Sequence, residues 1–285
     1  MAQEVAVNRP NREPQVIAES PPRVMVFIPA YRCASQIRRV IAQFAGREAE
    51  LACIDRVVVV DNRSPDDTIV AAQEAFAKLP SNFRKIILKN CDNYGLGGSH
   101  KVAMRHAQEA GMDYLLVLHG DDQADVVDVL PHLMSGKAFE SDCFLGSRFE
   151  LGSNRQGYSM LRTFGNVVYN GLFSAVAGRR VTDLGSGLNL YRVSKLDLTT
   201  IERFPDDLTF NYVMLLWSMF KQQDVRFFPI SWREVDQRSN VKLVSQALRV
   251  LGLLVRRAGN SGVFFAGDHR ATPREFYRSD VVHEG

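Results

Sequence analysis

The chain has 285 residues, of which 46% are hydrophobic and 24% charged, and its formal net charge is +3. This length allows one large domain, or one domain with a small appendage. The small net charge gives no reason to expect nucleic acid as a partner. The four cysteines have no CxxC spacing, which argues against a zinc or thioredoxin-type centre and is typical of reduced thiols.

The N-terminal segment and the apolar runs both bear on localisation. Residues 1–22 are polar and contain proline, without the apolar region of a signal peptide, so we expect a disordered lead. No apolar run approaches the ~18 residues of a membrane-spanning helix. We therefore expect a cytoplasmic protein, and leave open whether it lies at the cytosolic face of a membrane and whether it forms a homo-oligomer.

Strands and helices are expected to alternate over the first 150 residues. Short apolar runs, typical of strands buried on both faces, lie at 24–29, 55–61, 84–90, 112–119 and within 142–149. Helical spacing follows most of them, and one helix is expected to begin at Ser64, a good N-cap, and to end at about Lys78. The alternation predicts an α/β fold whose mostly parallel sheet is flanked by helices and binds ligands at the carboxyl ends of its strands.

The second half continues the alternation less regularly. Helices are expected at 158–177, 209–222 and 241–257, and strands at 186–192 and 225–230. No long linker separates the two halves. We therefore expect a lead at 1–22, one domain at 23–243, and a C-terminal amphipathic helix with its tail at 244–285.

The stretch "LHGDDQ" ends one of the expected strands and is the first candidate for a site. Asp121 and Gln123 are two residues apart, so in an extended segment both could point the same way and ligate one Mg²⁺ or Mn²⁺ through oxygen. Such an ion could also hold a diphosphate. The alternative for this stretch is a solvated acidic turn. His119, which ends the strand, could contact the metal or be a hydrogen-bonded histidine at the end of a strand.

Asp61 stands at the tip of a four-valine strand and is the second candidate. A carboxylate there can accept hydrogen bonds from a base or a ribose. The glycine-rich stretch "NYGLGGSHK" leads a helix, but it is not GxGxxG and does not follow the first strand, so a nicotinamide cofactor is not expected. Gly95, Gly97 and Gly98 fit close backbone approach to a nucleotide and tight helix packing equally well.

Seven segments, in this order, resemble one family: the inverting glycosyltransferases of family 2, which have a GT-A fold. The segments are "IPAY", "VDNRSPDDT", "NYGLGGSHKVAMRHA", "HGDDQ", "GSRF", "RTFGN" and "LGSGLNLYR". The resemblance covers about 24–243 and is closest to dolichol- or polyprenyl-phosphate sugar synthases. It implies a metal-dependent transferase that moves a sugar from a donor of the GDP-mannose or UDP-glucose type to polyprenyl phosphate. The alternative acceptor is a saccharide hydroxyl in cell-surface polysaccharide synthesis.

The resemblance also implies roles for individual residues. Asp121 and Gln123 would hold the metal, and Asp121 and Arg148 would be the catalytic residues, with Arg148 steadying phosphate charge as the donor bond breaks. For Arg148 the alternative is a surface salt bridge. The expected donor contacts are Pro29, Ala30, Tyr31, Asp61, Asn93, Gly97, Asp121 and Asp122. The expected contacts to the acceptor or its phosphate are Arg162, Ser186, Gly187 and Lys242.

The chain departs from the family pattern at several places. Arg32 and Cys33 follow "IPAY", where relatives usually have Asn-Glu, and His119 replaces the first acid of DxDxQ. "SNVKL" stands where relatives have Gly-x-Ser-Lys-Leu, so only Lys242 keeps its charge. We expect no membrane-spanning tail of the kind that many relatives carry, because no apolar run is long enough.

The acceptor can be approached through the charges of the second half. The stretches 151–182 and 237–267 contain arginine and lysine but no acid, and they fit either an amphipathic helix packed on the core or one lying on an anionic membrane. A sugar hydroxyl needs a carboxylate base, whereas a lipid phosphate is already anionic and needs cations. Asp206 and Asp207 could be such a base, or could cap the helix expected from Thr209. The capping interpretation favours polyprenyl phosphate.

Overall fold

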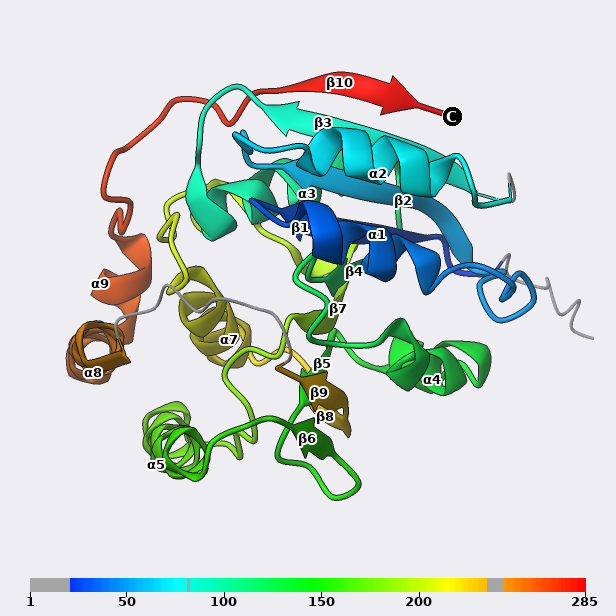
Figure 1. The fold of residues 1–285 in the computed structure, drawn as a ribbon. Coiled ribbons are helices and arrows are strands. Elements are labelled where there is room, and N and C mark those ends of the chain that lie inside the picture. Colours follow the sequence, from blue (N-terminus) through cyan, green and yellow to red (C-terminus); the bar gives the residue numbers. More distant parts are fainter. Residues whose placement is uncertain (1–20, 81–82, 235–242) are drawn as a thin grey trace, which may run out of the picture.

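The computed structural model describes residues 21–80, 83–234 and 243–285. Within these ranges one sheet has eight strands in the order β10-β3-β2-β1-β4-β7-β5-β8 (Figure 1). Its strands are β1 (Val24–Ala30), β2 (Ile54–Asp61), β3 (Arg84–Asn90), β4 (Tyr114–Leu118), β5 (Cys143–Ser147), β7 (Leu188–Arg192), β8 (Val225–Pro229) and β10 (Ser279–Glu284). Two short strands, β6 (Asn154–Gln156) and β9 (Ser231–Arg233), form a separate parallel pair.

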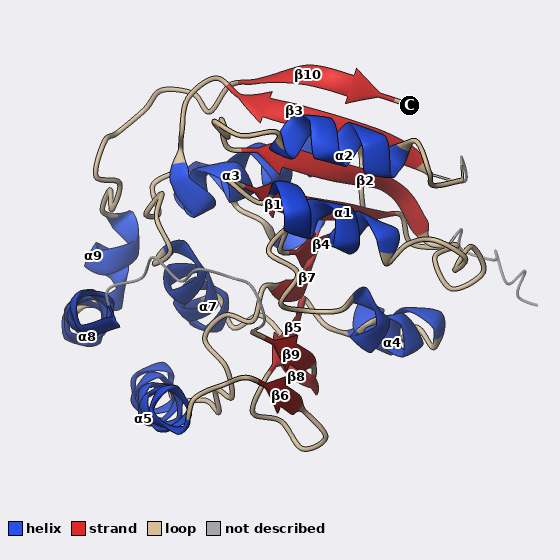
Figure 2. Ribbon diagram, viewed as in Figure 1, coloured by secondary structure: helices blue, strands red, loops and turns tan. Residues whose placement is uncertain are grey.

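Helices cover both faces of the large sheet, with α1 and α2 on one face and α3 on the other (Figure 2). The helices are α1 (Ala34–Ala42), α2 (Thr68–Phe76), α3 (Gly95–Glu109), α4 (Leu130–Met134), α5 (Met160–Ala177), α6 (Leu198–Ile201), α7 (Phe210–Phe220), α8 (Leu243–Gly259) and α9 (Ser261–Ala266). β7 is antiparallel to β4 and β5, and β10 is antiparallel to β3, while the other pairs in the sheet are parallel. The predicted mostly parallel sheet flanked by helices is therefore confirmed.

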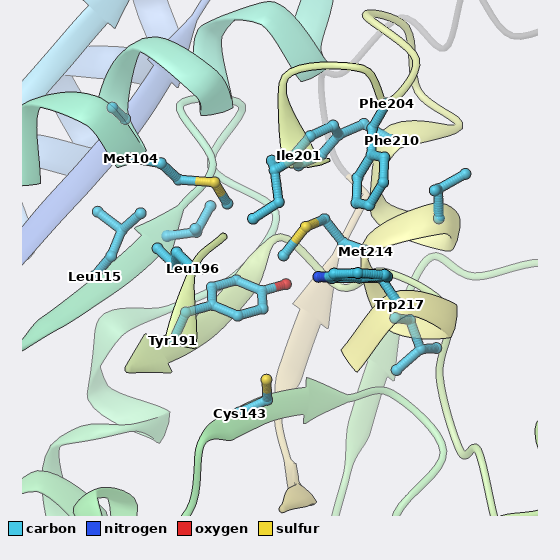
Figure 3. Packing of buried hydrophobic residues seen from close by; sticks show 14 of the residues in the cluster. Met104, Leu115, Cys143, Tyr191, Leu196, Ile201, Phe204, Phe210, Met214 and Trp217 are labelled. Carbon is cyan, nitrogen blue, oxygen red and sulfur yellow. The ribbon is translucent and has the colours of Figure 1, made fainter. Parts of the chain in front are cut away.

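The valine run of β2 shows why the central strands are apolar without alternation. Val58 and Val60 belong to the core cluster on the α3 side, and Val57 and Val59 to the cluster on the α1 and α2 side. Because successive side chains of a strand point to opposite faces, a strand covered on both faces must be apolar at every position. Figure 3 shows part of the α3-side cluster, in which side chains of α3, β7 and α7, including Met104, Tyr191 and Trp217, pack together.

Two features of the chain differ from the sequence-based expectation. The helix expected from Ser64 begins only at Thr68, because Arg63 takes a left-handed conformation with φ of 60° and the Ser64 N–H donates to the Asp61 carboxylate. The loop at 62–67 therefore adopts a conformation that lets it hydrogen-bond to Asp61, and the helix starts only after it. The C-terminal tail contains β10, which was not predicted, since an edge strand with an exposed face has a weak apolar signal.

The C-terminal region packs on the same body as the rest of the chain. Val250, Leu253 and Leu254 of α8 are buried in the α3-side cluster, and β10 completes the sheet next to β3. The lead expected at 1–22 lies almost wholly outside the described residues. Among the helices that the structure describes, none combines the length and the apolar character needed to cross a membrane.

Candidate active site

A cavity of about 300 Å³ opens where β1, β2 and β4 end. Ala30, the last residue of β1, is in register with Asp61, the last residue of β2, so the loops after both strands start at the same level. This is the edge of a parallel sheet at which α/β proteins bind ligands. The residues around the cavity are Pro29, Ala30, Tyr31, Cys33, Asn62, Leu96, Ser99, His119, Gly120, Asp121 and Leu208. Three of the expected donor contacts, Pro29 to Tyr31, thus lie together with Asp121.

Asp121 is the acid that lines this cavity. Its Oδ1 accepts a hydrogen bond of 3.3 Å from the Gln123 N–H. Burial raises the pKa of the Asp121 carboxyl to about 6, the neighbouring charge of Asp122 adds to the rise, and backbone hydrogen bonds work against it. Burial makes the negative charge of this carboxylate energetically costly. A cation bound in the same cavity would offset that cost.

The turn carries two side chains of types that ligate hard divalent cations, of which Asp121 lines the cavity and Gln123 does not. Asp121 supplies a carboxylate and Gln123 an amide oxygen, both ligand types that Mg²⁺ and Mn²⁺ accept. A cation there could complete its coordination with the oxygens of a bound diphosphate. In the part of the chain that the structure describes, no three His, Cys, Asp or Glu side chains gather into a metal site of their own.

Asp122 forms ion pairs with two arginines, which occupy the carboxylate oxygens that could otherwise bind a metal ion or the donor. Its carboxylate accepts from Arg39 Nε at 2.6 Å and from an Arg233 guanidinium nitrogen at 2.6 Å, and Gln43 contacts it at 3.3 Å. Asp122 is buried and has a φ of 60°, a backbone conformation that is uncommon outside glycine. These contacts fix the turn that carries Asp121. Asp122 therefore fits a positioning role better than the donor contact expected from the sequence.

Asp61 is fully buried beside the cavity. Its Oδ2 accepts from the Ser64 N–H at 2.9 Å, whereas its Oδ1 has no hydrogen-bond partner among the described residues. A buried acceptor without a partner costs about 1–3 kcal/mol, which a hydrogen bond from a ligand or a water molecule would relieve. Asn62, the next residue, lines the cavity and donates to the Asn93 side chain at 2.8 Å. Asp61 thus keeps the capacity to bind that the sequence suggested.

The glycines at the start of α3 serve packing. The Gly97 N–H donates to the Asp206 carbonyl at 2.8 Å, and a Cβ at Gly97 would lie 2.3 Å from the Pro205 carbonyl oxygen. A Cβ at Gly95, whose φ is 72°, would also collide with a backbone carbonyl oxygen, that of Asp206. Of the two interpretations left open by the sequence, the structure supports tight packing. The N–H of Gly97 is thus used within the protein, and Asn93 is exposed outside the cavity of Asp121.

His119 occupies the first position of the metal motif and packs against Gly187. The two residues are bonded through the His119 N–H and the Gly187 carbonyl at 3.0 Å, and a Cβ at Gly187 would lie 2.7 Å from the imidazole. Burial lowers the pKa of His119 to about 4, and that of its neighbour His100 to about 3. Both rings are therefore neutral at pH 7. Gly187 packs against the first residue of the segment at 119–123, and its φ of 72° is a conformation that favours glycine.

Arg148 forms a buried ion pair instead of a surface salt bridge. Its Nε and one terminal nitrogen bind the two carboxylate oxygens of Asp183 at 2.8 and 2.7 Å. The same terminal nitrogen also donates to the Gly185 carbonyl, and the guanidinium lies over the Trp232 ring at 4.8 Å. Although burial alone would lower the pKa of Arg148, the charge and hydrogen bonds of Asp183 raise it. The guanidinium is thus committed to the segment at 183–187, which is a positioning role.

The structure describes only part of the remaining residues that are expected to contact the acceptor. Ser186 is fully buried, and its Oγ contacts the backbone of Leu188. The side chain of Arg162 and the whole of Lys242 lie outside the described residues, so their roles stay predictions.

Sequence reasoning missed a buried network around Lys101. The Lys101 ammonium donates to the Phe204 carbonyl at 2.6 Å, to Asp206 Oδ1 at 2.6 Å and to the Tyr277 hydroxyl at 3.0 Å. Tyr277 also donates to Asp206 Oδ1, at 2.7 Å. Burial lowers the pKa of Lys101 to about 8. Its position one turn after Gly97 and Gly98, on the buried face of α3, is the signal that could have shown it.

Asp206 and Asp207 are both engaged by the protein. Asp206 belongs to the Lys101 network, and Asp207 accepts from the Thr209 N–H at 2.8 Å and from the Thr209 hydroxyl at 2.5 Å, just before α7. Asp207 also meets Arg249 at 3.2 Å. The Asp207 carboxylate thus closes the turn before α7, whose N-cap is Thr209 without a side-chain cap hydrogen bond, so Asp207 does not cap the helix as the capping interpretation expected. Both acids border a second cavity of about 820 Å³ that is enclosed by α8 and the segment before β10.

Comparison with known proteins places the chain in a group of sugar transferases. Residues 25–198 match the family described as glycosyl transferase family 2. A UDP-N-acetylglucosamine–dolichyl-phosphate N-acetylglucosaminyltransferase from Methanococcus voltae is 23% identical over 185 residues, which are 61% of this chain and 70% of that protein.

Solved structures of glucosyl-3-phosphoglycerate synthase from Mycobacterium tuberculosis have a similar fold. One in complex with phosphoglyceric acid has a TM-score of 0.58 at 16% identity, over 84% of this chain and 80% of that one. Another, in complex with Mn²⁺ and UDP-glucose, has the same TM-score and identity over 84% of this chain and 79% of that one. These likenesses confirm the predicted GT-A type of fold.

Proposed function

The chain belongs to glycosyl transferase family 2, and from this premise we propose that it transfers a sugar from a nucleotide-sugar donor to polyprenyl phosphate with a divalent metal ion. The observation that carries the donor half is the cavity at the ends of β1, β2 and β4, which Asp121 lines and Asp61 adjoins. Such a cavity lies at the low end of the volumes that hold small ligands in proteins.

The donor is proposed to bind with its nucleoside in this cavity and its diphosphate at Asp121 and Gln123. Tyr31 and the backbone of Pro29 and Ala30 form the wall for the nucleoside, and the free oxygen of Asp61 can accept a hydrogen bond from it. The metal ion, when bound, would neutralise charge on the leaving diphosphate. The solved relative that binds Mn²⁺ with UDP-glucose and the curated relative named for UDP-N-acetylglucosamine make UDP-sugars the first donors to test.

The chain's own residues contribute position more than chemistry. Arg39 and Arg233 hold Asp122, and thereby fix the backbone from which Asp121 projects. Arg148 holds Asp183, which in turn accepts from the Gly185 N–H at 3.2 Å and shapes the segment that reaches Gly187. Because Gly187 packs on His119, the segment at 183–187, where the acceptor is expected, touches the segment at 119–123, where the metal is expected. Such fixed geometry is what transfer between two bound substrates requires.

A phosphate acceptor is supported by the state of the two acids that could have served as a base. A sugar hydroxyl needs a carboxylate within hydrogen-bond reach to remove its proton. Asp206 is bonded to Lys101 and Tyr277, and Asp207 to Thr209 and Arg249, so both carboxylates already have partners. A polyprenyl phosphate is already ionised and can attack without such a base. The named relatives act on dolichyl phosphate or bind phosphoglyceric acid, which are both phosphorylated molecules.

Donor binding can be tested by calorimetry with UDP-sugars and GDP-mannose, with and without Mn²⁺. We expect metal-dependent binding in the wild type and its loss in Asp121→Asn. Asp280→Asn, which removes an exposed carboxylate from the distant edge strand, is the matched control and should bind as the wild type does. Metal-independent binding that persists in Asp121→Asn would overturn the donor site.

Acceptor choice can be tested by transfer of labelled sugar to short-chain polyprenyl phosphate, to phosphoglycerate and to free saccharides. We expect lipid-linked product, with retention of activity in Asp207→Asn. Product on saccharide alone, abolished in Asp207→Asn, would assign the chain to the alternative reaction at a hydroxyl. Product on phosphoglycerate alone would keep the phosphate chemistry and reject the lipid.

A further inference from the structure

The helix α5 exposes an apolar stripe along its length. Met160 and Phe164 are 89% and 68% exposed, although a folded chain normally buries such side chains. The spacing of the exposed positions is that of one helix face. They are Met160, Phe164, Val167, Val168 and Leu172. Phe173, on the opposite side, is fully buried, so this stripe is a second apolar face in addition to the one that packs on the core.

The helix α8 contributes a similar stripe beside it. Leu248, Leu251 and Val255 are exposed at helical spacing, while Val250, Leu253 and Leu254 are buried. α5 and α8 contact each other and are seen nearly end-on, one beside the other, in Figure 1. The exposed positions of the two helices are called the α5–α8 face below. Large exposed apolar side chains that gather on two neighbouring helices mark a docking site more often than scattered exposed residues do.

The charged residues within the two stretches of sequence that carry the α5–α8 face are all basic. The sequence stretches 151–182 and 237–267, which contain both helices, have no acidic residue. Arg180, Arg249 and Arg256 are exposed within them. Two of these arginines meet acids from other segments, at 3.4 Å in Arg180–Glu150 and 3.2 Å in Arg249–Asp207, but exposed pairs of this kind exchange readily with other anions.

We propose that the α5–α8 face docks on the surface of a membrane that contains anionic lipids. The apolar side chains would enter the boundary between headgroups and acyl chains, and the arginines would meet lipid phosphates. A second copy of the chain is a poorer occupant, because a two-fold interface would bring the exposed arginines of both helices in one copy close to those of the other. The proposal rests on the proposed function, since a polyprenyl phosphate acceptor lies in a membrane.

The position of the face suits delivery of a lipid acceptor. The residues after α5 lead to the segment at 183–187, which the Arg148–Asp183 pair fixes and which touches the metal motif through Gly187 and His119. The end of α5 and the cavity of Asp121 are thus joined by one short, ordered stretch of chain. An acceptor phosphate at the membrane surface would approach the donor from this side.

The test is flotation of the full chain with vesicles, without donor or acceptor. Vesicles of phosphatidylcholine alone are compared with vesicles that also contain phosphatidylglycerol. We expect binding to the anionic vesicles, and a weakening of at least about tenfold in the double variant Phe164→Glu/Leu248→Glu. Val70→Glu changes an apolar residue of α2 that is 49% exposed and is the matched control, which should bind as the wild type does.

Three outcomes would overturn the membrane proposal. One is equal flotation of the wild type and the double variant, and another is an absence of binding to either vesicle. The third is a dimer in analytical ultracentrifugation that the double variant dissociates, which would assign the face to a second copy. Transfer to detergent-dispersed acceptor is measured in parallel: its failure with intact vesicle binding rejects the proposed function alone, and the converse result rejects the docking surface alone.

Discussion

Buried polar groups in two regions of the molecule differ in how far the protein itself pairs them. At the ends of β2 and β4, Asp61 Oδ1 has no partner among the described residues, and Asp121 lines a cavity with a raised pKa. In the second half, Arg148 binds Asp183 through two nitrogens, and at the interface of the two halves Lys101 has three partners. Both regions carry charged residues inside the fold, but Arg148 and Lys101 find carboxylate partners within the protein, whereas Asp61 keeps an oxygen that a ligand could bind.

This difference separates binding residues from positioning residues. A buried charge with a complete set of partners fixes the local geometry. Removal of one partner is destabilising, because it leaves the other charge buried without compensation. A carboxylate whose charge is desolvated without a matching cation costs stability and favours the binding of a metal ion or a hydrogen-bond donor. Substitutions should therefore have opposite effects on stability in the two regions.

The largest effect is expected for Arg148→Met. The change leaves Asp183 as a buried charge without its partner, which should lower the free energy of unfolding by about 3–5 kcal/mol. Urea unfolding of the variant measures this loss, and Arg155→Met, at an exposed arginine, is the control. A variant of unchanged stability but without turnover would show that Arg148 acts on the substrate, and would break the comparison.

Asp121→Asn should act in the opposite direction on stability while abolishing metal-dependent donor binding. We expect a loss of donor affinity in the presence of Mn²⁺ of about 100-fold or more, because several kcal/mol of charge neutralisation disappear. The apoprotein should become more stable at pH 7, by about 1–3 kcal/mol, since burial raises the pKa of this carboxyl to about 6 and its charge opposes folding. Thermal unfolding with and without Mn²⁺ and UDP-sugar tests both halves. A variant that loses stability would place Asp121 among the structural ion pairs.

The fold could be predicted from the sequence where the pattern of burial is simple. β3 was predicted with its observed bounds, and β1 and β2 to within one residue at each end, because strands buried on both faces are continuous apolar runs between polar loops. β10 could not be predicted, since its partner β3 lies nearly 200 residues earlier and supplies the hydrogen bonds that its own sequence does not announce. The start of α2 failed because Asp61 takes the Ser64 N–H, a tertiary need that overrides local capping preference.

The candidate site divides in the same way. Pro29, Tyr31 and Asp121 meet at one cavity as expected, because parallel strands bring their carboxyl ends to one edge. The role of Arg148 toward phosphate stays a prediction, but its pairing with Asp183 could not be predicted, because a motif shows the presence of a charge and not its partner, which lies 35 residues away in the chain. For the same reason the contact of Lys101 with Tyr277 could not be predicted, because the two residues lie far apart in the sequence.

The pH dependence of donor binding should reveal the first region directly. The metal needs the ionised form of Asp121, whose pKa of about 6 means that the carboxyl takes up a proton as the pH falls below that value. We expect kcat/KM at limiting Mn²⁺ to fall about tenfold for each pH unit well below 6, and to recover at higher Mn²⁺ concentration, because the metal competes with the proton. The stability of the apoprotein should change in the opposite sense for this group, rising as the pH falls through 6. An acid limb near pH 4 that Mn²⁺ does not move would indicate an ordinary, exposed carboxylate.

The smallest effect is expected for Tyr277→Phe, which trims the fully paired network. The hydroxyl accepts from Lys101 and donates to Asp206, so its removal loses two bonds to charged groups, while Lys101 and Asp206 keep their own contact of 2.6 Å. We expect a loss of about 1–2 kcal/mol in the free energy of unfolding, with donor affinity unchanged. Tyr94→Phe, whose hydroxyl makes two bonds to the neutral backbone carbonyl and N–H of Arg278, is the reference and should lose less. Equal losses in the two variants would show that the charges of Lys101 and Asp206 add nothing to the hydroxyl bonds. A donor affinity that falls with Tyr277→Phe would show that the loop at 205–208, which borders both cavities, transmits strain from the C-terminal segment to the donor site.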